Sequence, residues 1–530
     1  MRSTTRTATP ALIAAIALVL AALAVAAAGA AQNGAHPLTL AEAIASALEK
    51  NEGILIERTA LDSAERAITG AEGAYDPLLG LAAGWRQTTE PVNSAFSGAA
   101  EGDLAPNFEG VEVTAGVSQL LATGAEVAVR ARGARDESDA SFDLLSPAYG
   151  SQLGVELRQP LLRDRAIDGA RLGLRVAAAD RERAAASLRR EVSETVAAVE
   201  RAYWALVAAR NEIAVREEAV RLADEQLSET DIRIQNGAAP ETEIAQPRAE
   251  LERRRGDLLA AQEAVARAEN TLKLLILDDE DTDLWLAPLA PAGDAAVEPV
   301  SIDAAAAIDQ ALASRPELEA AEAFIERRRA ETLFARDRVR PALDLVVSYD
   351  RFGFAGTRNP ASDPIPGLPT DVPPGLEGNL GDSLDRLADG DFDDARIGLV
   401  FEVPIGNRAA RAGAAIAENG ERQAEAELAR ARKVVRAEAL DAVAALETAN
   451  GRVEASRSAR EAAEVQLGAE RERFAVGLST NFLVLTRQND LSSARLDEIA
   501  ALTDHRTART ELARATGTLL EERGIEIDAE

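Results

Sequence analysis

Two stretches of this chain decide its fold: Arg233 to Leu251, "RIQNGAAPETEIAQPRAEL", and Arg473 to Leu491, "RFAVGLSTNFLVLTRQNDL". Each one interrupts a long run of helix-forming residues, and each carries a glycine in the position of a helix stop. The two glycines, Gly237 and Gly477, lie 240 residues apart, and neighbouring residues match at the same offset. A constant offset over more than 70 residues indicates two copies of one helical hairpin.

The first copy carries an apolar residue at every seventh position before the glycine. The series is Val192, Val199, Leu206, Ile213, Val220, Leu227 and Ile234, and the limb after the turn repeats it with Leu251, Leu258, Val265 and Leu272. A sustained heptad predicts a left-handed coiled coil. No proline lies between Pro160 and Pro240, so the ascending limb can extend for about 115 Å at 1.5 Å per residue. We therefore expect two long antiparallel hairpins.

The segments before the two hairpins are also duplicated, each as a helical region that runs into a strand near Pro77 or Pro341. Weak alternation of apolar residues predicts two strands in each copy. These strands are Leu78 to Arg86, Ser151 to Gln159, Ala342 to Asp350 and Ala395 to Val403. A further stretch, Val111 to Arg132, has the pattern of an additional hairpin that turns at Thr123-Gly124. The segment from Gly353 to Asp394 is rich in Pro, Gly and Asp, and we expect an exposed, mobile loop there.

The expected fold is mainly α with a small β part, built from two internal repeats. Repeat one covers 38–277 with its tip near 233–247, a linker or equatorial region covers 278–300, repeat two covers 301–517 with its tip near 473–487, and 518–530 is a tail. So few strands cannot close a barrel within one chain. An exported protein of this kind is expected to close its barrel by oligomerising in an outer membrane, where no backbone group can stay unpaired.

The N-terminus has the pattern of a secretory signal peptide over residues 1–30. A basic start precedes the apolar run Ala11 to Ala28, and small residues follow it. The alternative is an uncleaved membrane anchor. The chain has no cysteine, which excludes disulfides and a lipidated N-terminal cysteine. Its formal charge of −31 argues against nucleic acid and anionic lipid as partners.

No catalytic or metal-binding pattern is visible in the sequence. His36 and His505 are the only histidines, and no phosphate loop, nucleophile elbow or Cys-His pair occurs. We expect His505 to be solvated, and we expect no enzyme activity, cofactor or metal site.

Several motifs resemble those of the TolC-like outer membrane efflux proteins. They are "LTLAEAIASALEKN" near the start, "RQPLLRD" (Arg158 to Asp164), "EVPIGNRAARA" (Glu402 to Ala412) and the two tip stretches quoted above, all in order within the duplicated frame. The resemblance implies a homotrimer with an outer-membrane β-barrel in contact with lipid and a periplasmic tunnel of helices. It also implies partners: a periplasmic adaptor (membrane fusion) protein and an inner-membrane transporter of the RND or ABC type.

Carried over by position, the resemblance implies that the tips dock the adaptor. The tip residues are Gly237, Ala238, Val476, Gly477, Leu478 and Ser479. The competing interpretation, compatible with docking, is that both glycines simply cap their helices. The family's acidic constriction corresponds here to Glu243, with Glu241 beside it, whereas copy two has Leu483 at that position. Glu243 can equally serve as a solvated acid in the first turn of the returning helix.

The leading hypothesis is thus a passive export duct that is driven by a partner transporter. The alternative from another class is a structural or adhesive coiled-coil protein of the cell envelope, without transport activity. The duplicated strands and the returning limbs favour the duct, because a fibrous stalk needs neither. The exported substrate, and whether the partner pump uses protons or ATP, stay open.

Overall fold

The structure is a computed structural model, and it describes residues 36–89, 91–92, 98–99, 104–292, 297, 300, 303–362 and 371–527. The expected signal peptide lies outside the described residues. The chain divides into two compact units. The first comprises the chain up to Asp62 together with Glu182–Glu322 and Ala426–Glu530, and the second comprises Ser63–Arg181 and Ala323–Glu425.

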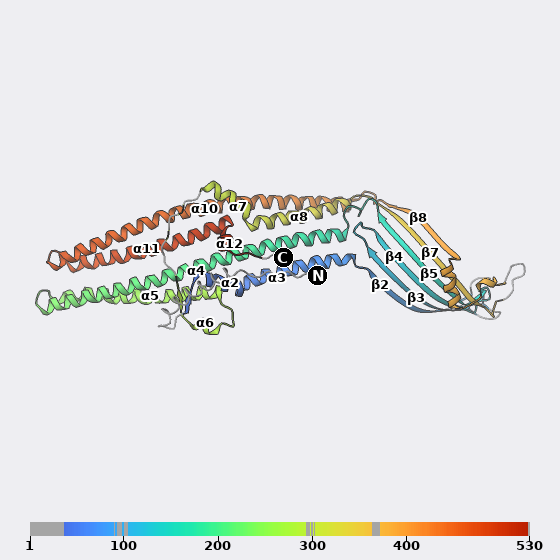
Figure 1. Ribbon diagram of the computed structural model, residues 1–530, viewed down its shortest axis with the longest axis horizontal. Coiled ribbons are helices and arrows are strands. Elements are labelled where there is room, and N and C mark those ends of the chain that lie inside the picture. Colours follow the sequence, from blue (N-terminus) through green and yellow to red (C-terminus); the bar gives the residue numbers. More distant parts are fainter. Residues whose placement is uncertain are drawn as a thin grey trace, which may run out of the picture. The chain divides into compact units, whose positions relative to one another are not determined.

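The long helices form two hairpins, whose tips and returning limbs belong to the first unit (Figure 1). The first pairs α4 (Gly169–Gln235) with α5 (Ala245–Ile276), with a short 3-10 turn, η2 (Glu241–Ile244), before α5. The second pairs α10 (Arg408–Ala475) with α11 (Asn481–Thr516). Helices α4 and α10 have 67 and 68 residues, so the prediction of two hairpins with equal long limbs is confirmed.

The heptad residues of α4 supply much of the core of this unit. Val192, Val199 and Leu206 are buried, and they share one cluster with Leu272 of the returning helix α5. Alanines such as Ala202 are buried in the same cluster. Because the alanines are small, helices can approach closely, and most of the core volume comes from Leu, Ile and Val rather than from aromatic residues.

Short elements brace the hairpins along their length. Each repeat contributes a pair of helices: α2 (Leu40–Lys50) and α3 (Glu52–Glu72) in the first, α7 (Ala304–Ser314) and α8 (Pro316–Asp337) in the second. Thr39 caps α2 in a capping box, and Asp303 caps α7. The remaining elements here are α6 (Thr282–Leu286), α12 (Leu519–Glu522) and a parallel pair of short strands, β1 (His36–Leu38) and β6 (Leu289–Pro291).

Two buried polar side chains tie these braces to α4. The Tyr203 hydroxyl lies 2.7 Å from the carbonyl oxygen of Ala292 and 3.1 Å from that of Leu38, and burial raises its pKa to about 12. The fully buried Glu200 accepts from the Arg523 guanidinium and from the Thr510 hydroxyl. Both α4 residues thereby satisfy groups whose burial without a partner would cost about 1–3 kcal/mol.

The second unit contains a six-stranded antiparallel sheet in the order β2-β3-β4-β5-β7-β8. The strands are β2 (Leu78–Thr89), β3 (Asn107–Leu120), β4 (Glu126–Ser138), β5 (Leu145–Pro160), β7 (Ala342–Arg358) and β8 (Phe392–Glu402), and a 3-10 turn, η1 (Gly73–Tyr75), precedes the first of them. The additional hairpin is confirmed as β3 and β4, with Gly124 at φ +81° in its turn. Two strands per copy was therefore wrong for the first copy, which has four.

The segment expected to be a loop from Gly353 to Asp394 contains regular structure. Strand β7 continues to Arg358, β8 begins at Phe392, and between them lie η3 (Pro374–Leu376) and the helix α9 (Leu380–Asp389). Asn379 and Asp382 form a capping box at the start of α9, and Gly390 ends it at φ +76°. Residues 380–389, which contain none of the prolines of this segment, form a capped surface helix instead of a loop.

Candidate pore face and hairpin tips

The pairing register gives the six-stranded sheet two distinct faces. Apart from the irregular pair Leu145↔Arg358, even-numbered residues oppose even-numbered residues in every pair of neighbouring strands, as in Ala82↔Thr114 and Gly154↔Asp350. Directly paired residues point to the same side, and successive residues point to opposite sides. The even-numbered residues of all six strands therefore share one face, and the odd-numbered residues share the other; we call these the even face and the odd face.

The odd face is apolar over most of its height. It presents Leu79, Leu81, Val111, Val113, Val117, Val127, Val129, Leu153, Val155, Leu345, Val347, Ile397, Leu399 and Phe401. Several are largely exposed, among them Leu81 at 74% and Ile397 at 79%. A band of exposed aliphatic side chains across neighbouring strands is the pattern of a sheet face that contacts lipid.

Aromatic residues mark one limit of this apolar band. The Trp85 indole donates to Glu109 at 2.9 Å, and the Arg351 guanidinium donates to the Tyr349 hydroxyl at 3.1 Å. Beyond them the odd face becomes charged. This change from aliphatic to aromatic to charged residues is typical of a membrane–water boundary.

The even face is polar, and ion pairs join neighbouring strands across it. Glu112 pairs with Arg132 at 2.7 Å, Arg130 with Glu156 at 3.0 Å, and Arg158 with Asp344 at 2.6 Å. Gln152 also donates to Asp350 at 2.9 Å. A face of hydrated charges on a sheet whose other face is apolar fits the wall of an aqueous pore. Sequence reasoning missed these residues, although their shared even numbering was the available signal.

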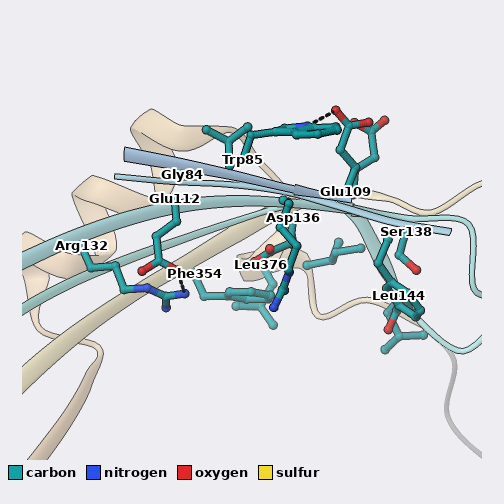
Figure 2. A pocket seen from close by; sticks show the side chains of 18 of the residues that line it. Gly84, Trp85, Glu109, Glu112, Arg132, Asp136, Ser138, Leu144, Phe354 and Leu376 are labelled. Carbon is teal, nitrogen blue, oxygen red and sulfur yellow. Dashed lines mark hydrogen bonds and ion pairs between the residues drawn. The ribbon is translucent and has the colours of Figure 1, made fainter. Parts of the chain in front are cut away.

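Figure 2 shows the two faces at one place in the sheet. Trp85 and Glu109 lie on one side of the strands, whereas Glu112, Arg132 and Phe354 lie on the other. The even face is hollowed here into a cavity of about 920 Å³, which Leu144 and Leu376 help to line. A second hollow of about 1310 Å³ continues across the same face, between Arg130, Glu156 and Arg396.

The two hairpin tips have the same backbone geometry. At the first tip the Gly237 amide donates to Ile234 at 2.9 Å and the Ala238 amide donates to Arg233 at 2.8 Å. At the second tip the equivalent bonds, from Gly477 and Leu478, are 3.0 Å and 2.8 Å. Both glycines are left-handed, at φ +70° and +75°. This pair of bonds is the Schellman motif, so both glycines do cap their helices.

Side chains also join the two hairpins near their tips. The Arg233 guanidinium lies 4.8 Å from the centre of the Phe474 ring, and the Asn481 amide donates to the Thr230 hydroxyl at 3.3 Å. Ser479 donates to Glu470, which is buried. These contacts bring the predicted tip residues of the two copies together at one end of the hairpins.

The surfaces of the two tips differ. The second tip exposes large apolar side chains: Val476 is 70% exposed, Leu478 79% and Phe482 60%. The first tip has only alanines after its glycine. Exposed apolar side chains gathered at one point mark a surface that other proteins can bind.

The candidate constriction residues Glu241 and Glu243 are both exposed. They lie in η2 rather than in the returning helix itself, and the Glu243 amide donates to the carbonyl of Pro240 at 3.0 Å. Leu483, at the matching position of copy two, is 39% exposed. Among the residues that the structure describes, no ion pair or side-chain hydrogen bond joins Glu241 or Glu243 to a basic residue.

His505 is buried, so the expectation of a solvated side chain was wrong. Its Nε2 lies 2.9 Å from Asn450 Oδ1, and burial, followed by the charges of Arg506 and Arg509, lowers its pKa. Because α11 packs against α10 at this height, a position read as surface from the sequence faces the interior.

Among the described residues no group of three or more potential metal ligands lies together. No described helix is long and apolar enough to cross a membrane.

Comparisons with known proteins agree with this geometry. Residues 307–518 match the family model of the outer membrane efflux proteins. The fold is similar to that of the Campylobacter jejuni CmeC outer membrane channel, with a TM-score of 0.63, 15% identity, and 93% of this chain and 90% of that chain covered. The chain thus has the fold of this outer membrane channel, and its residues 307–518 share sequence features with the outer membrane efflux protein family.

Two further channels have the same fold. The Vibrio cholerae outer membrane protein VceC matches with a TM-score of 0.59, 16% identity, and coverage of 90% of this chain and 96% of that chain. The open state of the Neisseria gonorrhoeae MtrE outer membrane channel matches with a TM-score of 0.59 and 16% identity, and the match covers 91% of this chain and 89% of that chain. A comparison with curated sequences finds no match.

Proposed function

We propose that this chain is an outer membrane protein with its helical tunnel in the periplasm, and that three copies of it form the exit duct of a tripartite efflux or secretion system. The duct is passive, and an inner-membrane transporter of the RND or ABC type drives transport through it by way of a periplasmic adaptor. One observation carries the proposal: the sheet has one apolar and one charged face, and within the described part of the chain no further strand pairs with the outer side of its edge strands, β2 and β8.

Trimerisation would remove both edges. Strands β2 and β8 run in opposite directions in this sheet, so β8 of one protomer can pair antiparallel with β2 of the next. Six strands from each of three protomers give a barrel of 18, a size that leaves an aqueous channel. The odd face would then meet lipid, and the ion pairs of the even face would line the channel.

The hairpin tips supply the contact with the adaptor in this proposal. The cap geometry accounts for Gly237 and Gly477, so docking belongs to the exposed side chains beside Gly477, above all Val476 and Leu478. Glu241 and Glu243 are proposed to form the acidic constriction, where three protomers would bring six carboxylates near one axis.

Native mass measurement of the detergent-solubilised protein tests the assembly, and a stable monomer would contradict it. Export of substrate from cells whose own gene for this protein has been deleted tests the role as a duct. Complementation by the wild type together with failure of Gly477→Trp, at unchanged trimer level, supports the duct. A protein that reaches the envelope but restores no export with any adaptor of its host favours the structural alternative.

A further inference from the structure

Helix α9 lies on the odd face of the sheet, over β5 and β7. Its Ser383 is fully buried, and the Ser151 hydroxyl of β5 lies 3.1 Å from the Ser383 carbonyl and 2.9 Å from its hydroxyl. Gly353 of β7 leaves no room for a side chain at this contact. Ser151 and Gly353 are both odd-numbered, so α9 lies on the face that carries the apolar band.

The helix lies at the level of the aromatic boundary. The Arg351 guanidinium, which donates to the Tyr349 hydroxyl, also donates to the carbonyl of Ala388 in α9 at 3.4 Å. Arg386 of α9 donates to the carbonyl of Phe354 at 2.6 Å. From Leu343 at the base of the band to Tyr349 is six residues, about 20 Å of strand, which is close to the height of a membrane-embedded apolar band. Two arginines therefore hold α9 where the band ends.

The sequence of α9 is amphipathic. Leu380, Leu384 and Leu387 share one stripe at i, i+4 and i+7, while Asp382, Asp385 and Asp389 occupy the opposite side. Leu380 is 44% exposed and Leu384 49% exposed, so the sheet covers only part of the stripe. A leucine stripe opposite a strongly charged face, at the edge of an apolar band, fits a helix that lies in a membrane interface. The charged face is acidic here, so burial of the leucines rather than attraction to anionic lipid would hold the helix there.

A second copy of the chain does not fit as the occupant of this stripe. Neighbouring protomers would reach the sheet at its edges β2 and β8, whereas α9 packs over the interior strands β5 and β7. The leucine stripe is instead continuous with the lipid-facing odd face. We propose that α9 is an interfacial helix whose leucines contact the acyl chains of the outer leaflet and fix the depth of the barrel. This rests on the proposed barrel, in which the odd face meets lipid.

The chain has no cysteine, so single cysteines can report the environment of chosen positions. Leu384→Cys in the full-length protein is labelled with an environment-sensitive fluorophore and reconstituted into phospholipid vesicles that contain spin-labelled lipids. We expect quenching by lipid labelled near the headgroup and protection from aqueous iodide. The matched control Asp385→Cys, on the opposite side of α9, should show the reverse.

Two sheet positions separate failure of this inference from failure of the barrel. Val129→Cys on the odd face should be quenched by lipid labelled deep in the acyl chain, and Arg130→Cys on the even face should be quenched by iodide alone. If the label on Val129→Cys is quenched by lipid, but iodide quenches the label on Leu384→Cys as strongly as the label on Asp385→Cys, the interfacial role of α9 is wrong. If lipid and iodide quench the labels on Val129→Cys and Arg130→Cys to the same extent, the proposal that the odd face contacts lipid is itself wrong, and the inference about α9 is then wrong as well.

Discussion

The exposed leucine of the second tip offers the most direct test of adaptor docking. Leu478 is 79% exposed in the protomer, and full burial of a leucine side chain contributes about 1.5–3 kcal/mol. About four fifths of that gain is still available when a partner covers the side chain. Leu478→Ala should therefore weaken adaptor binding by about 1–2 kcal/mol per protomer, which corresponds to roughly a 5- to 30-fold loss of affinity.

Leu478→Asp should weaken binding further, because a carboxylate in an apolar contact adds a desolvation cost. Neither change should affect folding of the trimer, since the side chain makes little contact within the protomer. The measurement is binding of the solubilised trimer to purified periplasmic adaptors of the same organism by biolayer interferometry, with export from cells as the second readout.

Leu259 provides a matched control. It is a leucine of α5, distant in sequence from either tip glycine, and it is 67% exposed. Leu259→Ala removes the same side chain from the same kind of helix surface, so it should leave adaptor binding unchanged. Equal losses for Leu259→Ala and Leu478→Ala, or no loss for either, would refute the assignment of docking to the second tip.

Three further changes test other features. Gly237→Ala and Gly477→Ala should each lower the free energy of unfolding by about 1 kcal/mol, because an added Cβ would meet no other atom and only the left-handed backbone would be strained. If the unfolding free energies of the two variants differ by more than about 1 kcal/mol, the two tips are not equivalent. Glu243→Gln should lower the cation selectivity of the reconstituted channel, whereas the control Glu263→Gln, on the exposed surface of α5, should not. If both variants show the same selectivity, Glu243 does not act in a constriction and is only a solvated acid. The pKa of His505 is lowered in the folded protein, so as the pH falls the unfolded chain binds the extra proton first, and stability decreases below about pH 6.5. His505→Gln should flatten the dependence of the melting temperature on pH in this range, and an unchanged dependence would contradict this role of His505.

The hairpins could be predicted from the sequence because their signals are local and repeated. A heptad, a glycine stop and a constant offset of 240 residues determine helix length and turn position without any knowledge of tertiary contacts. The burial of His505 could not be predicted in this way, since it depends on how α10 and α11 rotate against each other.

The sheet was only partly predictable. Weak alternation located four strands of the six-stranded sheet, and the pattern of a further hairpin located the other two, whereas the short strands β1 and β6 were not predicted. The two faces of the sheet become visible only when the register between strands is known, and turns and bulges determine that register. Helix α9 had a local signal that composition concealed: a capping box at Asn379 and leucines at i, i+4 and i+7 within an Asp- and Gly-rich segment. Reading that segment by composition alone gave a loop.

The two copies of the tip separate two roles that the sequence alone left together. Both tips keep the same pair of backbone bonds and a left-handed glycine, so the glycine is explained by the end of the helix whether or not anything binds there. Among the residues that differ is the one directly after the glycine, Ala238 in one copy and Leu478 in the other. A binding site can change at that position without disturbing the cap, because the side chain points into solvent while the amide makes the bond. Docking should therefore follow the side chains of the second tip, and a change that keeps both glycines can remove it.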